Sequence, residues 1–212
     1  SHGFRPNRSC HTALAQIQRT FTGVSWFVEG DIKGCFDNID HHILIDILKR
    51  RIKDEAFIDL IWKLLRAGYI EDWMRHQTYS GTPQGSGVSP LLANIYMNEL
   101  DQFMEEYRGR FNKGDKRRFS NARNAKKWEL MNEEERENAR IMQKELQTTL
   151  LSTPSRDQMD PNYRRIVYVR YADDFLIGVI GSKTDAEQVK TDVGDFLKQN
   201  LNLTMSPEKT LI

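Results

Sequence analysis

The chain has 212 residues and a net charge of +1, with 39% hydrophobic and 29% charged residues. This composition excludes a disordered chain and predicts a globular protein with one sizeable core. The sequence has no long apolar run that would suggest a membrane-spanning protein and no signal peptide that would suggest an exported one. Its only cysteines, Cys10 and Cys35, exclude a disulfide framework and a cysteine zinc site, which favours a reducing compartment.

The first residues, SHGFRP, lack an initiator Met, and we expect them to belong to a longer protein. Ser9 is predicted to cap a helix over residues 10–21. Arg5 and Arg8 precede this helix, where they either hold a phosphate group or are solvated loop residues. The apolar stripe of the helix is predicted to be Leu14, Ile17 and Phe21.

Residues 24–32 form a predicted strand that delivers Asp31 at its end. Asp40 then caps a predicted helix over residues 42–52, and a second helix follows over residues 56–68. An aspartate at a strand end is by itself most simply the approach to the next helix. The inward-facing residues of the two helices are predicted to be Ile43, Ile47, Leu48, Phe57, Ile61, Leu64 and Leu65.

A glycine-rich segment, GTPQGSGVSP, occupies residues 81–90. We expect Ser89 to cap the helix that follows, with Pro90 in its first turn. A glycine-rich loop before a helix offers backbone N–H groups to an anion or a base edge, although a flexible connector has the same composition. Gln84 is the one long polar side chain in this loop.

Residues 104–165 are predicted to be a charged helical insertion that stands off the sheet. Its segment 108–127 holds nine basic residues and a single acidic one, Asp115. Such a segment favours contact with a nucleic-acid backbone over simple solvation.

Residues 166–180 form a predicted β-hairpin in which two apolar runs flank Ala172, Asp173 and Asp174. Aspartates are common in turns, so a plain surface hairpin is one interpretation. Both arms are apolar enough to be buried on two faces, which instead places the acids at the edge of a core. Paired carboxylates raise each other's pKa unless they share a cation, and two such hard ligands suit Mg²⁺.

After the hairpin, a capping box at residues 184–187 predicts a helix that continues to Leu201. Residues 203–212 are predicted to form two short strands around a turn that carries Lys209. The order of strand, helices, insertion, hairpin, helix and strands predicts an α+β fold.

Four blocks of the sequence resemble, in order and spacing, the palm motifs of reverse transcriptases: WFVEGDIKGCFD, GTPQGSGVSPLLANIYMNELD, YVRYADDFLIG and LTMSPEKT. The HGFRP start and the DPNYRRIVYVRYADDF approach to the hairpin are similar to those of group II intron-encoded reverse transcriptase/maturase proteins. The resemblance implies a right-hand polymerase palm, an antiparallel sheet with packed helices, together with partial fingers and a helical insertion but no thumb. The parts that it implies are a fingers base (1–23), a palm with fingers helices (24–103), the insertion (104–165) and a palm part with the YADD hairpin (166–212).

For the active site, the resemblance implies two Mg²⁺ ions, which Mn²⁺ can replace, held by Asp31, Asp173, Asp174 and the Ile32 carbonyl. Asp31 and Asp173 would bridge the metals, and Asp174 would be the less demanding ligand. Phe36 would lie under the incoming sugar and exclude a ribose 2′-hydroxyl.

The same resemblance implies roles for four further residues. Gln84 and Gly85 would contact the nucleotide or the template, and Lys209 would protonate pyrophosphate. Arg5 would lie near the template at the base of the fingers.

The function implied is that of a group II intron RNA-directed DNA polymerase, which copies intron RNA into cDNA for retrohoming and assists splicing in the full-length protein. Its partners would be an RNA template, structured intron RNA, a DNA primer or target, and dNTPs, but no membrane.

Two alternatives remain: another palm polymerase, or an RNA-binding maturase without polymerase activity. Phe36 argues against a polymerase that copies into RNA. The complete set of acids argues against a purely binding role. We expect a bacterial cytoplasmic protein associated with the nucleoid, or an organellar one, and we expect this segment alone to polymerise weakly and to form homodimers through exposed apolar surface.

Overall fold

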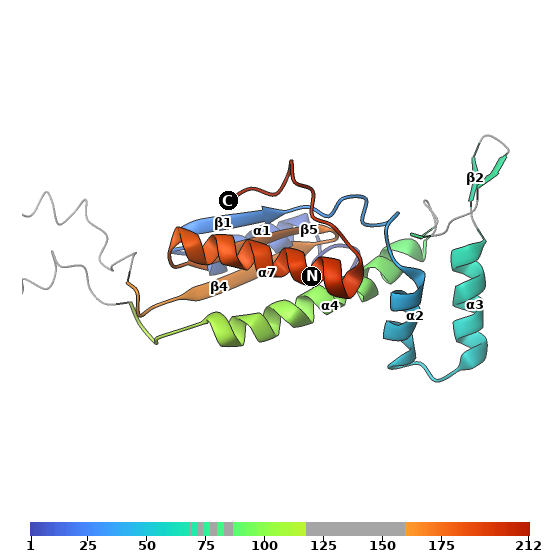
Figure 1. The fold of residues 1–212 in the computed structure, drawn as a ribbon, viewed down its shortest axis with the longest axis horizontal. Helices are drawn as coiled ribbons and strands as arrows, with labels where there is room; N and C mark the ends of the chain where they lie inside the picture. The colour runs from blue at the N-terminus through green and yellow to red at the C-terminus, as the bar shows by residue number, and fades with distance from the viewer. Residues whose placement is uncertain (68, 72–73, 77–79, 83–86, 118–159) are drawn as a thin grey trace, which may run out of the picture.

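The structure is a computed structural model, which describes residues 1–67, 69–71, 74–76, 80–82, 87–117 and 160–212 (Figure 1). The mixture of helices with antiparallel strands confirms the predicted α+β class. The elements are α1 (Cys10–Thr20), β1 (Trp26–Gly30), α2 (His41–Lys49), α3 (Glu55–Arg66), β2 (Tyr69–Glu71), β3 (Met74–His76), α4 (Ser89–Phe111), β4 (Arg165–Tyr171), β5 (Asp174–Ile180) and α7 (Lys183–Leu201).

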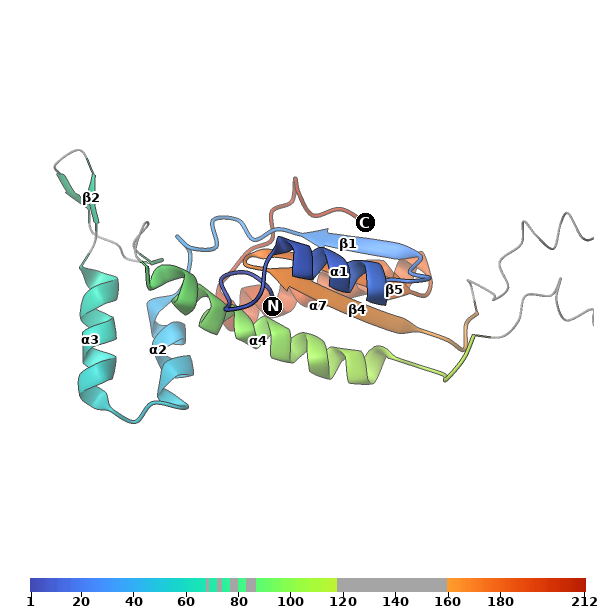
Figure 2. The same ribbon diagram turned by 180° about the vertical axis from the view of Figure 1, so that it is seen from behind.

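The main sheet is antiparallel with the order β1-β5-β4, so the second arm of the predicted hairpin is its central strand. Helices α4 and α7 lie on one face of this sheet, and α1 lies on the other (Figures 1 and 2). Side chains of β5 alternate between the two faces, with Ile177 and Val179 in the larger core and Leu176 against α1. Both arms of the hairpin are therefore buried on two faces, as their composition predicts.

Helices α2 and α3 lie side by side beyond one end of the sheet (Figures 1 and 2). Asp40 caps α2 as predicted, through bonds from the backbone N–H groups of His42 and Ile43 to its side chain. A small hairpin of β2 and β3 follows α3 and was not predicted, because three-residue strands leave almost no pattern in the sequence.

The predicted apolar stripes of α1 and α3 are wrong at one position each. Leu14 is 61% exposed, while its neighbour Ala13 is buried against the sheet, where a small side chain allows close approach. Phe57 is 41% exposed, and Ile58 takes its place in the core. The other predicted residues that lie on the packed faces include Phe21 of the first stripe and Ile61 and Leu65 of the second, which are buried.

Two predicted helix caps are also shifted. The residue that caps α4 is Val88, which makes no side-chain cap bond, and Ser89 is already inside the helix, although a proline does follow in the first turn. The capping box of α7 joins Ser182 to Asp185, two residues earlier than predicted.

The first residues of the predicted insertion belong to α4, which continues to Phe111 and buries Met104 in the main core. Lys113 pairs with Arg164 across this predicted segment. Most of the predicted insertion, residues 118–159, lies outside the described residues. None of the helices in the described part of the chain is long and apolar enough to cross a membrane.

Candidate active site

The register of the sheet brings two predicted acids to the same end. Gly30 at the end of β1 pairs with Phe175 in β5, so Asp31 and Asp174 are the next residues on each strand. Burial raises the pKa of Asp174, and the charges of Asp173 and Asp31 and a hydrogen bond with Asp31 raise it further. The carboxylates of Asp173 and Asp31 are thus close enough to disfavour the ionisation of Asp174.

Asp173 lies at the tip of the hairpin, beside a small recess that Phe36 and Cys35 also line. Burial raises the pKa of the Cys35 thiol to about 12, and the charges of Asp173 and Asp31 contribute to this rise. The Phe36 ring is half-buried and meets the Phe4 ring edge to face, with centroids 6.3 Å apart.

Lys209 lies beside the acids, in a turn near the C-terminus. Its Nζ is 3.1 Å from the Asp31 carboxylate. The hydrogen bond and charge of Asp31 raise the pKa of Lys209, with smaller contributions from Asp174 and Asp173. The Ser206 N–H donates to the Asp31 carbonyl and holds this segment against the end of β1.

A groove of about 650 Å³ opens beside these residues, between α1, the sheet and the C-terminal segment. Asp31, Asp174 and Lys209 line it together with apolar side chains that include Leu14 and Leu211. The groove is therefore charged where the acids line it and apolar along the rest of its wall.

Among the described residues, no three histidine, cysteine, aspartate or glutamate side chains are already arranged to hold a metal ion. Asp31 is instead paired with the Lys209 ammonium. The assignment of Asp31, Asp173, Asp174 and the Ile32 carbonyl as metal ligands therefore stays a prediction.

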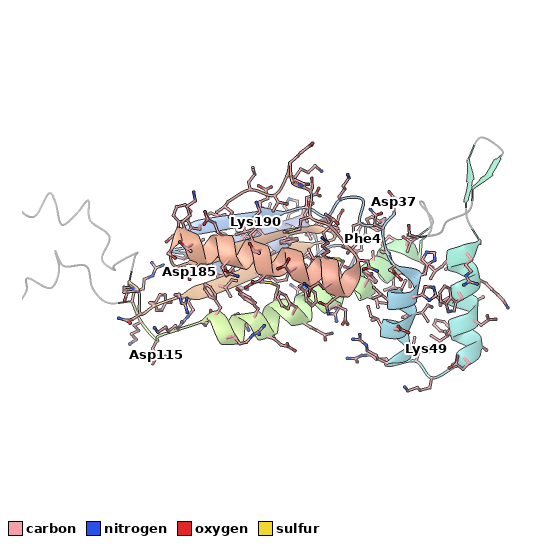
Figure 3. The ribbon with its side chains drawn as sticks, viewed as in Figure 1. Phe4, Asp37, Lys49, Asp115, Asp185 and Lys190 are labelled. Atoms are coloured by element: carbon pink, nitrogen blue, oxygen red, sulfur yellow. The ribbon has the colours of Figure 1, made fainter. Side chains whose placement is uncertain are left out.

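The other predicted site residues do not all join this cluster. Arg5 is exposed and lines a separate open pocket of about 1030 Å³ between α2 and α4, which Arg50 and Arg51 also border. Gln84 and Gly85 lie outside the described residues. Figure 3 shows Phe4 and Asp37 at the acid end of the sheet and Asp185 at the opposite end, where α7 begins.

Sequence reasoning missed a buried ion pair behind the hairpin. The Arg170 guanidinium is almost completely buried and binds both carboxylate oxygens of Asp101, which comes from α4. Burial by itself would raise the pKa of Asp101, but the hydrogen bonds and charge of Arg170 hold it below its usual range. The signal for this ion pair in the sequence was Arg170 itself, a charged residue within a predicted strand that is mostly apolar.

These features define an α+β protein with a carboxylate site at one end of an antiparallel sheet. The family model for reverse transcriptase (RNA-dependent DNA polymerase) matches residues 1–120. The chain therefore belongs to the reverse transcriptase family.

Within this family, the chain is similar to intron-encoded proteins. It is 45% identical over its whole length to the group II intron-encoded protein LtrA of Lactococcus lactis subsp. cremoris, of which it covers 36%. It is 25% identical over 99% of its length to the mitochondrial nuclear intron maturase 1 of Arabidopsis thaliana, of which it covers 34%. The chain thus spans about a third of the length of these relatives.

Among solved structures, the chain is similar to telomerase from Candida tropicalis in complex with a fragment of telomeric RNA. The TM-score is 0.49 at 11% identity, over 95% of this chain and 28% of that one. The sequence resemblance to group II intron-encoded reverse transcriptase/maturase proteins is confirmed by the family match and by LtrA.

Proposed function

We propose that this chain is the palm, with part of the fingers, of a group II intron RNA-directed DNA polymerase that extends a DNA primer by two-metal nucleotidyl transfer. The observation that supports this most directly is the meeting of Asp31 with Asp173 and Asp174, from segments far apart in the sequence. A role in stability does not explain it, because like charges that raise the pKa of Asp174 oppose folding at neutral pH.

The acids fit Mg²⁺ by their chemistry. Asp174 makes a hydrogen bond with Asp31, and Asp31 forms an ion pair with the Lys209 ammonium. The acids therefore bind one cationic group in this structure, which supports the binding of a metal cation. Carboxylate oxygens are the ligands that Mg²⁺ prefers. Mg²⁺, or Mn²⁺ in its place, would be held by the three aspartates with the Ile32 carbonyl, and would activate the primer 3′-hydroxyl and stabilise the leaving pyrophosphate.

Residues around the acids would position the nucleotide. Phe36 borders the same recess as Asp173. This closeness supports the proposal that its ring would exclude a ribose 2′-hydroxyl from the site. Lys209 lies 3.1 Å from the Asp31 carboxylate, and from this place beside the acids it would donate a proton to the leaving pyrophosphate. Gln84 and Gly85 would contact the nucleotide or template from the loop before α4.

The nucleic-acid partners follow from the charge of the surface and from the relatives. Arg5, Arg50 and Arg51 around the pocket between α2 and α4 would bind the template phosphates. The basic segment 108–127 of the predicted insertion would bind structured intron RNA. In the full-length protein we propose cDNA synthesis for retrohoming and assistance to splicing, a role that accords with the intron maturase among the relatives.

Primer extension by the full-length protein on an RNA template tests this proposal. We expect DNA synthesis with Mg²⁺ and dNTPs, no detectable synthesis by Asp173→Ala, and full activity of Asp195→Ala, which alters an exposed acid on α7. We expect Phe36→Val to raise the use of rNTPs relative to dNTPs by roughly 10–200-fold, because it removes the bulk that excludes the hydroxyl.

Extension by Asp173→Ala at the wild-type rate would show that the carboxylate site is wrong. If neither protein extended the primer while both bound intron RNA, the chain would be an RNA-binding module instead.

A further inference from the structure

Arg170 is an unusual residue for its position. It is the penultimate residue of β4, it is 2% exposed, and it lies on the face of the sheet that α4 covers. A buried guanidinium is costly to desolvate, and an apolar residue packed in its place often gives equal or greater stability. Stability alone is therefore a weak reason for an arginine at this position.

The contacts of Arg170 join two elements. Its Nε and Nη2 donate to the two carboxylate oxygens of Asp101 in α4, at 2.9 and 2.7 Å. Its Nη1 donates to the Ala172 carbonyl in the turn of the hairpin, at 2.5 Å. One rigid, planar group thus ties the turn to a helix. A lysine ammonium also has several donors, but it lacks the fixed fork that binds both Asp101 oxygens and the Ala172 carbonyl at once.

The turn that Arg170 holds is a strained one. Ala172 has a φ of 56°, in the left-handed region that residues other than glycine rarely adopt. Asp173 and Asp174 follow it directly. A backbone in this conformation persists only where its surroundings impose it, and the bond to the Ala172 carbonyl does so from the side of α4.

A second contact encloses the turn. The Gly3 backbone is so close to Ala172 that a Cβ on Gly3 would lie 2.5 Å from the Ala172 nitrogen. The Asn94 amide of α4 donates to the Gly3 carbonyl at 2.8 Å, and the His2 N–H donates to the Arg170 carbonyl at 2.9 Å. The turn is therefore enclosed by α4 and by the residues before α1.

We propose that Arg170, held by Asp101, is a positioning residue that keeps the turn in the one conformation in which Asp173 and Asp174 face Asp31. It acts through the Ala172 carbonyl, while its Nε and Nη2 are bound to Asp101. Because α4 begins just after the glycine-rich loop, the same pair connects the acids to the helix that follows the nucleotide-binding loop. This inference rests on the proposed function for its catalytic consequence, but the constraint on the turn can be measured independently.

Arg170→Lys is the first variant. It keeps a cation for Asp101 but loses the planar guanidinium that also binds the Ala172 carbonyl. The matched control is Arg164→Lys, which alters the ion pair of Arg164 with Asp185 at the other end of β4, at 2.9 Å. In the full-length protein, we expect Arg170→Lys to extend primers roughly 10–100-fold more slowly and to need more Mg²⁺ for half-maximal rate. We expect the control to stay within about twofold of wild type, as partly exposed ion pairs contribute little.

Hydrogen exchange gives a readout that does not depend on catalysis, measured at the Asp174 amide, in the pair that closes the turn with Tyr171, and at the His2 amide, which donates to the Arg170 carbonyl. We expect exchange there to be faster in Arg170→Lys than in wild type and in Arg164→Lys, without Mg²⁺ or nucleic acid. Unchanged protection of these amides, or an unchanged Mg²⁺ requirement, would overturn the proposal.

A double variant, Arg170→Met with Asp101→Asn, separates positioning from stability. It removes both charges and keeps an acceptor for the Tyr168 hydroxyl, which bonds Asp101 in the wild type at 2.9 Å. We expect a melting temperature near that of the wild type together with slow extension and an unprotected turn. Recovery of the wild-type rate by the double variant would show that the pair serves stability alone; if the double variant does not fold, the comparison of the two lysine variants decides.

The failure of this inference differs from the failure of the proposed function. If the wild type does not extend primers, the polymerase assignment is wrong, and hydrogen exchange still decides whether Arg170 constrains the turn. If the wild type is active and Asp173→Ala is not, an Arg170→Lys protein that behaves like its control refutes only the positioning role.

Discussion

At the scale of single residues, ionised Asp174 lowers the stability of the folded protein. The raised pKa of Asp174 means that the folded protein binds this proton more tightly than the unfolded chain does, so its contribution to stability is lost as pH rises through the folded-state pKa. We expect Asp174→Asn to raise the melting temperature at pH 7 in metal-free buffer, because it removes a repelled charge. Calorimetry with and without Mg²⁺ measures this.

Added Mg²⁺ should raise the melting temperature of the wild type more than that of the variant, since a cation that binds only the folded state stabilises it. Asp195→Asn, at an exposed position of α7, is the control and should respond like the wild type. A variant that melts below the wild type in metal-free buffer would contradict this account of the acids.

Gly3 offers a second test at this scale. A Cβ there meets the backbone of Ala172, which cannot move aside as a flexible side chain would. We expect Gly3→Ala to displace the hairpin tip and to slow primer extension by about tenfold or more, since small displacements at a reacting centre are costly. Steady-state extension rates give the comparison.

Gly109→Ala is the matched control, because nothing lies within 4 Å of a Cβ at this helical position. It should leave activity unchanged and stabilise the protein by roughly 0.5–1 kcal/mol, the usual gain in a helix. Equal activity of the two variants would rule out a close contact between Gly3 and the turn.

At the scale of elements, the start of α2 supports the glycine-rich loop. His41 is buried, and its Nε2 lies 2.6 Å from the Gly81 carbonyl, where this loop begins. The Gly81 N–H donates to the Ile39 carbonyl and the Thr82 N–H to the Phe36 carbonyl, both at 2.8 Å. The first residues of the loop are therefore bound to the segment that carries Phe36.

We expect His41→Ala to free the start of the loop and to raise the KM for dNTPs several-fold, with a smaller effect on kcat, because the contact holds the loop that we propose to bind the nucleotide and not the acids. His42→Ala is the control, as its side chain is exposed and packs on Trp62. An unchanged KM in a folded His41→Ala protein would show that the loop is held by its backbone bonds alone.

At the scale of the whole molecule, the pair of Asp101 and Arg170 links the sheet to α4 and makes stability depend on pH. The pKa of Asp101 is below its usual range, so its contribution to stability is present above about pH 4 and is lost as pH falls through the lower folded-state value. We expect Asp101→Asn to be less stable than the wild type above pH 5 and the difference to shrink toward pH 3. Denaturant unfolding at a series of pH values measures it, and a constant difference would contradict the assignment.

Local signals predicted much of this molecule. Ser9 and Asp40 cap α1 and α2 because a cap needs only a side-chain oxygen and the next few backbone N–H groups. The two apolar arms around Asp173 and Asp174 predicted a buried hairpin with acids at its tip. A continuous run of apolar residues indicates a strand that is buried on both faces. These features depend on residues close together in the chain.

What only the tertiary structure decided depends on residues far apart. The register of β1 against β5 places Asp31 beside Asp174, and the packing of α4 on β4 buries Arg170 against Asp101. The packing of α1 on the other face of the sheet exposes Leu14, because the face of α1 that is buried depends on what the sheet presents to it. A buried charge is acceptable only where a distant partner meets it, and the identity of that partner is set by the packing of whole elements.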